Sequence, residues 1–266
     1  FGSSVQQRQC SGAAQRAMAW LRLATLLLGA SLVQQGQGTT GVVGHQVELY
    51  FGNGCFFARQ HSLVQFEQMA LGRANATVTS VAAYAGSAHT PPRLCYHNDG
   101  GIDVYSDLGA AEVVTLRLPA ENVTAAAKAY FETFIEIDAG VYVRPDTMDV
   151  GAEYRSLIGI PGGIDGELFP LIAAGNEHQM RLVPGNGSEN DTFATNNVYI
   201  MDSTLFPARH AEVCLQFHDD PNAVYSPSYH ALSEALQSSG RLFGVGCPKN
   251  YICDPPEQRS PADIWL

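Results

Sequence analysis

Apolar and polar residues alternate along five short stretches of the chain, and this alternation predicts β-strands. The five stretches are bounded by turn-forming residues, and they are VELYF (47–51), VTSVAAYAG (78–86), AEVVTLRL (111–118), RSLIGI (155–160) and NNVYIMDS (196–203). Apolar residues at helical spacing predict helices within SLVQFEQM (62–69), VTAAAKAYFETFIEI (123–137) and YHALSEALQSSG (229–240). Prolines and glycines between His89 and Tyr105 predict a loop there.

The predicted strands and helices follow one another without a recognisable linker, which favours a single domain. With 266 residues, 45% of them hydrophobic, the chain is long enough to bury a sizeable core. We therefore predict an α+β fold: one two-layer α/β domain with a mixed central sheet over about 42–217. A loop-rich C-terminal extension is expected over 218–266.

The charge and the N-terminal segment indicate which partners and which cellular compartment to expect. The formal net charge is −11, and the 15 Lys and Arg form no run, so nucleic acid is an unsuitable partner. From Met18, the apolar segment MAWLRLATLLLGASLVQQGQG is typical of a signal peptide, expected over 18–38, with residues 1–17 upstream of the true start. A signal anchor and an untranslated leader are the alternatives.

Four N-glycosylation sequons support passage through the secretory pathway, and they begin at Asn75, Asn122, Asn186 and Asn190. We expect a secreted or lumenal protein with no membrane attachment once the signal is removed. Apart from Cys10 in the leader, the chain has five cysteines: Cys55, Cys95, Cys214, Cys247 and Cys253. Because an odd number leaves at least one thiol unpaired in a secreted protein, one of the five is a candidate reactive thiol.

Cys55 lies in GNGCFF, between a predicted strand and a predicted helix. Backbone N–H groups at a helix N-terminus stabilise a thiolate, the form in which cysteine acts as a nucleophile. A buried structural thiol beside two aromatic residues is the alternative reading.

Four motifs occur in a fixed order around this cysteine: GNGCFF (52–57), SVAAYAG (80–86), SDLGAAEVV (106–114) and DVGAEYRS (149–156). Together they resemble the peptide methionine sulfoxide reductase A (MsrA) family, which carries GCFWG-, GYAGG-, GHAEVV- and DxGxQYRS-type motifs. The resemblance covers roughly 48–217, and FPARHAEVCLQFH (206–218) resembles a further family segment. It implies an MsrA-like sheet with a ferredoxin-like core.

The resemblance also implies roles for individual residues. Cys55 matches the nucleophile that attacks the sulfoxide sulfur, and Glu112 matches the acid that protonates its oxygen. A carboxyl that stays protonated near neutral pH needs an apolar environment, which the neighbouring alanines and valines of GAAEVV supply. Asp149 and Tyr154 match the DxGxxY pair, and Tyr96 matches the second tyrosine, with Tyr105 as the alternative.

The implied activity is that of a peptide-methionine (S)-S-oxide reductase acting on methionine S-sulfoxide, free or in oxidised proteins. Phe56 and Phe57 are expected to enclose the substrate S-methyl group. A Cys55 sulfenic acid would condense with a second thiol, and an external dithiol such as thioredoxin would reduce the resulting disulfide. The candidate resolving residues are Cys247 and Cys253. We expect no metal and no bound cofactor.

Alternatives remain open from the residues themselves. Cys247 and Cys253 could instead form a structural disulfide, with each other or with Cys95 or Cys214. The chain also departs from the family motifs at five places: Phe57 replaces tryptophan, Ala110 histidine, Glu153 glutamine, Gln60 an acidic residue, and Cys214-Leu215 a tyrosine-histidine pair. A non-catalytic secreted glycoprotein that uses the fold as a binding module is the competing function, and a thiol peroxidase is a third.

Overall fold

The core of the molecule is a seven-stranded mixed sheet, seen in a computed structural model that describes residues 44–98, 101–193, 195–248 and 253. Its strand order is β7-β8-β6-β1-β3-β2-β9. The strands are β1 (Gln46–Gly52), β2 (Val81–Ala85), β3 (Ala111–Pro119), β6 (Leu157–Ile160), β7 (Arg181–Pro184), β8 (Asn197–Asp202) and β9 (Arg209–His210). The pairs β6–β8 and β7–β8 are parallel and the others are antiparallel.

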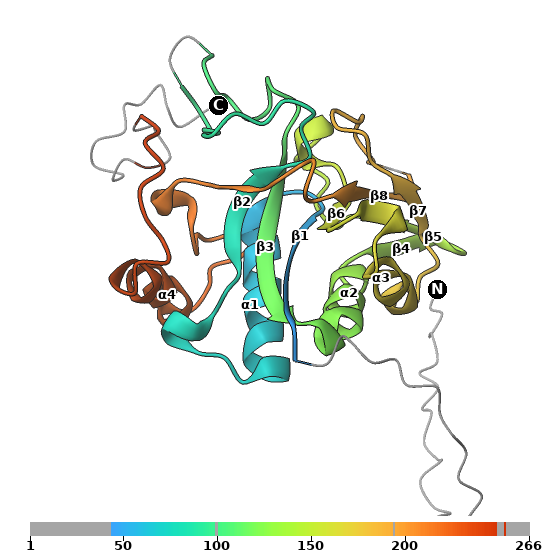
Figure 1. The fold of residues 1–266 in the computed structure, drawn as a ribbon, viewed down its shortest axis with the longest axis horizontal. Coiled ribbons are helices and arrows are strands. Elements are labelled where there is room, and N and C mark those ends of the chain that lie inside the picture. The colour runs from blue at the N-terminus through green and yellow to red at the C-terminus, as the bar shows by residue number, and fades with distance from the viewer. Residues whose placement is uncertain (1–43, 99–100, 194, 249–252, 254–266) are drawn as a thin grey trace, which may run out of the picture. The chain divides into compact units, whose positions relative to one another are not determined.

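Three helices lie on one face of this sheet, and a fourth packs beside β2 and α1 (Figure 1). The helices are α1 (Phe56–Leu71), α2 (Val123–Phe131), α3 (Phe169–Gly175) and α4 (Pro227–Ser238). A separate hairpin of β4 (Ile135–Asp138) and β5 (Val141–Val143) follows α2. The predicted α+β class and mixed central sheet are confirmed.

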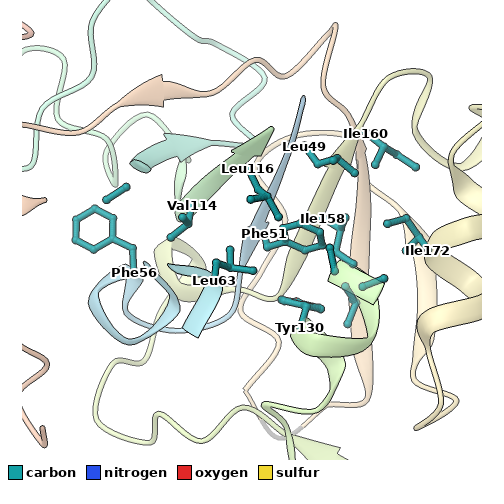
Figure 2. Packing of buried hydrophobic residues seen from close by; sticks show 14 of the residues in the cluster. Leu49, Phe51, Phe56, Leu63, Val114, Leu116, Tyr130, Ile158, Ile160 and Ile172 are labelled. Atoms are coloured by element: carbon teal, nitrogen blue, oxygen red, sulfur yellow. The ribbon is translucent and has the colours of Figure 1, made fainter. Parts of the chain in front are cut away.

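The main core fills the space between the sheet and the helices α1, α2 and α3. Figure 2 shows Phe51 of β1 between Leu63 of α1 and Tyr130 of α2, with Leu49 of the same strand on the side of Ile160 of β6. The alternation of β1 turns Tyr50 to the opposite face, where its ring packs over Gly159 of β6. A Cβ on Gly159 would lie 2.0 Å from that ring, so this close approach requires glycine.

The α4 helix is joined to the core by its own hydrophobic cluster. Leu232 and Leu236 of α4 pack with Val64 of α1 and Val81 of β2. Ser226 caps the helix by accepting a hydrogen bond from Tyr229 N, and Pro227 occupies the first helical position. Residues of the expected C-terminal extension therefore share apolar packing with the sheet domain.

The helix predicted over 123–137 is shorter in the structure. The pattern over 123–137 predicts a continuous helix, but α2 ends at Phe131 and residues 135–138 form β4. The Thr133 hydroxyl donates to the Tyr130 carbonyl at 2.6 Å, which competes with continued helical bonding. The β-branched Thr133, Ile135 and Ile137 then alternate as in a strand.

The predicted N-terminal leader (1–17) and signal peptide (18–38) lie outside the described residues. Within the part of the chain that the structure describes, no helix is both long and apolar enough to cross a membrane.

Candidate active site

Cys55 occupies the N-cap position of α1, at the end of the turn that leaves β1. The turn depends on two glycines. A Cβ on Gly52 would lie 2.4 Å from the Glu112 carbonyl oxygen, and Gly54 has φ +82°, where a Cβ would meet Asp146. The turn therefore brings the Cys55 backbone next to β3. Cys55 is half-buried and is the free cysteine among the described residues.

The electrostatics of Cys55 differ from the expectation of a stabilised thiolate. Burial raises the pKa of the Cys55 thiol, and the charge of Glu112 raises it further. The backbone N–H of Phe57 at the start of α1 acts in the opposite direction but is outweighed. The predicted stabilisation of the thiolate by backbone N–H groups at the helix N-terminus is present, but desolvation dominates at this position.

Glu112 points into the same place from β3 and is 2% exposed. One carboxyl oxygen accepts a hydrogen bond from Phe56 N at 2.8 Å, and the other accepts one from the Tyr105 hydroxyl at 3.0 Å. Burial raises the pKa of Glu112 to about 8, against the lowering effect of these two hydrogen bonds. The carboxyl is therefore mostly protonated at neutral pH.

Four tyrosines gather around this carboxyl. Tyr105 stacks on Tyr84 at 4.4 Å and on Tyr96 at 5.7 Å between ring centroids. Burial raises the pKa of Tyr154, and a hydrogen bond with Tyr105 opposes that shift. Tyr105, which the sequence ranks second to Tyr96, is thus the tyrosine that donates directly to Glu112, while Tyr96 lies against its ring.

The two predicted substrate-enclosing phenylalanines lie at the start of α1. Phe56 is 1% exposed and contacts Tyr84, with ring centroids 5.8 Å apart. Phe57 is 9% exposed, and its ring stacks on His218 at 4.6 Å. Both phenylalanines therefore belong to the main hydrophobic core, and Phe57 also packs against His218.

Asp149 and Tyr154 are held beside Cys55 by residues that the motifs do not include. Asp146 accepts a hydrogen bond from Cys55 N at 2.9 Å and another from Asp149 N at 3.1 Å. Burial, followed by the neighbouring charge of Asp146, raises the pKa of Asp149 to about 6. Gly54 N donates to the Tyr154 carbonyl at 2.9 Å, which ties the two motif loops together.

Arg144, which is 2% exposed, connects the loop of Tyr154 to the loop of Asp191. Its guanidinium donates to the Tyr154 carbonyl at 3.0 Å and pairs with Asp191 at 2.5 Å. Arg155 of the DVGAEYRS motif is fully buried and donates to the carbonyls of Gly86 and Gly109 at 2.7 and 3.0 Å. Sequence reasoning missed Asp146, Arg144 and Asp191, whose only signal is charge within otherwise ordinary loops.

Glu212 is a second buried carboxyl near the tyrosines and was also missed. It accepts hydrogen bonds from the Tyr84 hydroxyl at 2.9 Å and from Tyr96 N at 2.8 Å. One of its oxygens and the sulfurs of Cys95 and Cys247 all lie within 4.8 Å of one another. Glu212, which lies next to the Cys95–Cys247 disulfide, therefore holds Tyr84 and Tyr96 in place through hydrogen bonds.

The four remaining described cysteines form two disulfides, Cys95–Cys247 and Cys214–Cys253. The candidate resolving residues Cys247 and Cys253 are not bonded to each other. Each forms a disulfide with a cysteine of the 42–217 region. Their resolving role stays a prediction, as do the glycans. Among the sequons, Asn75, Asn186 and Asn190 are exposed, whereas Asn122 is half-buried.

The comparisons with known proteins give structural likeness alone. No family model matches the chain, and no curated protein matches it significantly in sequence. Methionine sulfoxide reductase A of Corynebacterium diphtheriae is 16% identical with a TM-score of 0.43, and the match covers 69% of this chain and 80% of that one. Mxr1 from Saccharomyces cerevisiae in reduced form is 16% identical with a TM-score of 0.38, over 69% and 90% of the two chains.

Proposed function

We propose that this chain is a thiol-dependent reductase of methionine S-sulfoxide, free or in proteins, with Cys55 as nucleophile and Glu112 as acid. The observation that carries the proposal is Glu112: a buried carboxyl with a pKa of about 8, bonded to the first backbone N–H of the helix that begins after Cys55. A protonated carboxyl beside a free thiol is suited to a reaction in which an oxygen atom must be protonated as it leaves sulfur.

The first half-reaction balances with these groups alone. The sulfoxide oxygen passes to Cys55 Sγ, the methionine sulfur is reduced to the thioether, and the cysteine becomes a sulfenic acid. Glu112 gives its proton to the sulfoxide oxygen and regains one from the thiol. Because the Glu112 charge raises the pKa of Cys55, keeping Glu112 neutral also makes the thiolate easier to form.

The tyrosines supply the polar contacts that the sulfoxide oxygen needs in an otherwise apolar site. Tyr105 donates to Glu112, Tyr154 interacts electrostatically with the same carboxyl, and the raised pKa of each hydroxyl keeps it a hydrogen-bond donor. Phe57 would face the substrate methyl group. The preference for the S-epimer is taken from the motif resemblance.

A reductant must restore Cys55, and a thioredoxin-like dithiol in a secretory compartment is the partner that the resemblance implies. Cys247 or Cys253 can take part only if its disulfide to Cys95 or Cys214 is opened first. We propose the secretory setting on the strength of the N-terminal pattern and the four sequons.

The test is turnover of the two separated sulfoxide epimers of blocked methionine with dithiothreitol as reductant. We expect reduction of the S-epimer, loss of that activity in Cys55→Ser, and retention in a Cys214→Ser, Cys253→Ser control. Full activity of Cys55→Ser would refute the nucleophile, and exclusive reduction of the R-epimer would refute the reaction assigned.

A further inference from the structure

The pairing of the cysteines restricts how a Cys55 sulfenic acid can be reduced. A sulfenic acid condenses with a thiol, whereas a disulfide has no S–H group to offer. Among the described residues Cys55 is the free cysteine, and the other four are joined as Cys95–Cys247 and Cys214–Cys253. With both disulfides intact, the described part of the chain holds no thiol that can resolve the intermediate.

We propose, resting on the function above, that a small external thiol reduces the Cys55 sulfenic acid directly, and that the acidic cavity beside Cys55 selects neutral or cationic thiols over anionic ones. This assigns the co-substrate of the second half-reaction by chemical class. Under this proposal the disulfides Cys95–Cys247 and Cys214–Cys253 take no part in the catalytic cycle.

The cavity has a volume of about 710 Å³ and lies beside the first turn of α1. Its walls are residues 145–149 on one side and 220–222 on the other, with Ala58 of α1 between them. Asp146 in this wall accepts the hydrogen bond from Cys55 N at 2.9 Å, so a wall residue of the cavity directly contacts the Cys55 backbone. Cavities of several hundred Å³ hold small molecules, and a small thiol is well within that size.

The segment 218–225, to which the sequence motifs assign no role, builds the second wall. His218 stacks on Phe57, and Tyr225 stacks on His61 of α1 with ring centroids 3.7 Å apart. Asp219 accepts a hydrogen bond from Tyr225 N at 2.7 Å, which closes the segment into a loop. The loop is thus anchored to the helix that carries the active-site turn.

The charge of the cavity is negative on both walls. Burial opposes ionisation of Asp146, but hydrogen bonds from Cys55, Asp149 and Met148 keep its pKa below the ordinary value. The charges of Asp149 and Asp220 both act on the Cys55 thiol and raise its pKa. Two cations lie nearby: Arg144 is paired with Asp191, and the buried Arg59 of α1 interacts with Asp146 and Cys55 and offsets part of this negative charge.

The same field acts on an incoming thiol. The attacking form is the thiolate, so each thiol arrives with one more negative charge than its protonated form. The thiolate of an aminothiol is a zwitterion, the thiolate of an uncharged thiol carries one negative charge, and the thiolate of a sulfonate thiol carries two. Charged clefts change association rates by about tenfold or more, and the effect falls with ionic strength. The order of rates should therefore follow the charge of the thiol.

The chemistry balances in two steps. The first thiolate attacks Cys55 Sγ, an S–S bond forms, and the S–O bond breaks to release hydroxide, which is protonated to water. A second thiolate attacks the external sulfur, which returns Cys55 as a thiolate and releases the external disulfide. Two thiols are oxidised for each sulfenic acid reduced.

The experiment uses the full chain with its disulfides intact. The Cys55 sulfenic acid is made in two ways, with one equivalent of methionine S-sulfoxide and with one equivalent of hydrogen peroxide, and is verified with a dimedone probe. Its decay is then timed with cysteamine, 2-mercaptoethanol and 2-mercaptoethanesulfonate. Each rate is divided by that of the same thiol with a neutral model disulfide.

We expect cysteamine to react about tenfold faster than the sulfonate at low salt, with the ratio shrinking as salt is added. Asp220→Asn should reduce the ratio several-fold. Asp165→Asn makes the same charge change at an exposed position outside the cavity wall and should leave the ratio unchanged.

Two results would overturn the proposal. Equal normalised rates for the three thiols would refute charge selection by the cavity. A Cys55 disulfide to any other cysteine of the chain, Cys10 included, found by mass mapping before thiol is added, would refute direct reduction. Failure of the sulfoxide, but not of peroxide, to give the sulfenic acid would refute the proposed function while the thiol measurements still test this inference.

Discussion

Replacing Glu112 with glutamine keeps the shape of the side chain and removes its proton chemistry. The amide oxygen can still accept the hydrogen bond from Phe56 N or from the Tyr105 hydroxyl. General acid catalysis by a positioned group typically contributes about 10²–10⁴-fold. We therefore expect a loss in that range in the single-turnover reduction of methionine sulfoxide by the prereduced protein.

The same substitution has a consequence for stability that does not depend on the function. The pKa of Glu112 is raised from 4.5 to about 8 in the folded chain, so the folded state holds a proton that the unfolded state loses. This contribution to stability is fully present below about pH 4.5 and is lost as the pH rises through about 8. With about 1.36 kcal/mol for each pKa unit, the wild type loses about 3 kcal/mol between about pH 5.5 and pH 8.5 through this group.

Glutamine does not titrate, so the variant escapes that loss. Urea unfolding of both proteins at about pH 5.5, 7 and 8.5 should show the stability difference moving by about 3 kcal/mol in favour of Glu112→Gln as the pH rises. Asp149, whose pKa is also raised, is present in both proteins and cancels from the difference.

A stability difference that stays constant with pH would refute the view of Glu112 as a protonated buried acid. A loss of less than about threefold in the chemical step would show that another group protonates the oxygen. The two measurements are independent. If the variant shows the pH effect on stability but keeps full activity, the raised pKa of Glu112 is confirmed and its role as the catalytic acid is refuted.

Three further substitutions test the surroundings of the site. Tyr105→Phe removes a hydrogen bond that lowers the pKa of Glu112, so the alkaline limb of kcat/KM against pH should move upward and the rate should fall about tenfold. Arg144→Met leaves the Asp191 carboxylate without its buried partner and should cost about 3 kcal/mol in urea unfolding, whereas a cost under about 0.5 kcal/mol would contradict the bridging role. Removing the Cys95–Cys247 disulfide by two serine substitutions should lower stability by about 2–5 kcal/mol but preserve single-turnover reduction, and loss of the dimedone-reactive Cys55 product would contradict this.

The strands were predictable because each carries its own local signal. In β1 the alternation of Leu49, Tyr50 and Phe51 is read directly as two faces, and the structure turns them to opposite sides of the sheet. The strands and helix that the sequence missed are β7, β9, α3 and the β4–β5 hairpin, which are short or largely exposed. Such segments are decided by their neighbours more than by their own pattern.

The candidate site was predictable to the extent that its residues lie in compact motifs. Cys55, Glu112 and the pair Asp149 and Tyr154 come from three separate motifs, and the structure links their segments through Phe56 N, Tyr105 and Asp146. Among the residues that make these links, Phe56 and Tyr105 were candidates from the sequence, whereas Asp146 carries no local signal of its own. Asp146 acts through a turn that faces Cys55 from 91 residues away, and no sequence period encodes that contact.

The expected stabilisation of the Cys55 thiolate is outweighed by other effects in the structure, and the reason bears on catalysis. A helix N-terminus acts on Cys55 through one or two N–H groups, whereas burial and the Glu112 charge act together against ionisation. A sequence reveals the helix but not how far the thiol is withdrawn from water. If the thiol is protonated in the resting protein, its activation must be coupled to the protonation of Glu112, and the pH dependence of the first half-reaction should then fall as Glu112 ionises near pH 8. A rate that instead rose steadily through that range would show that free thiolate, rather than the neutral carboxyl, limits the step.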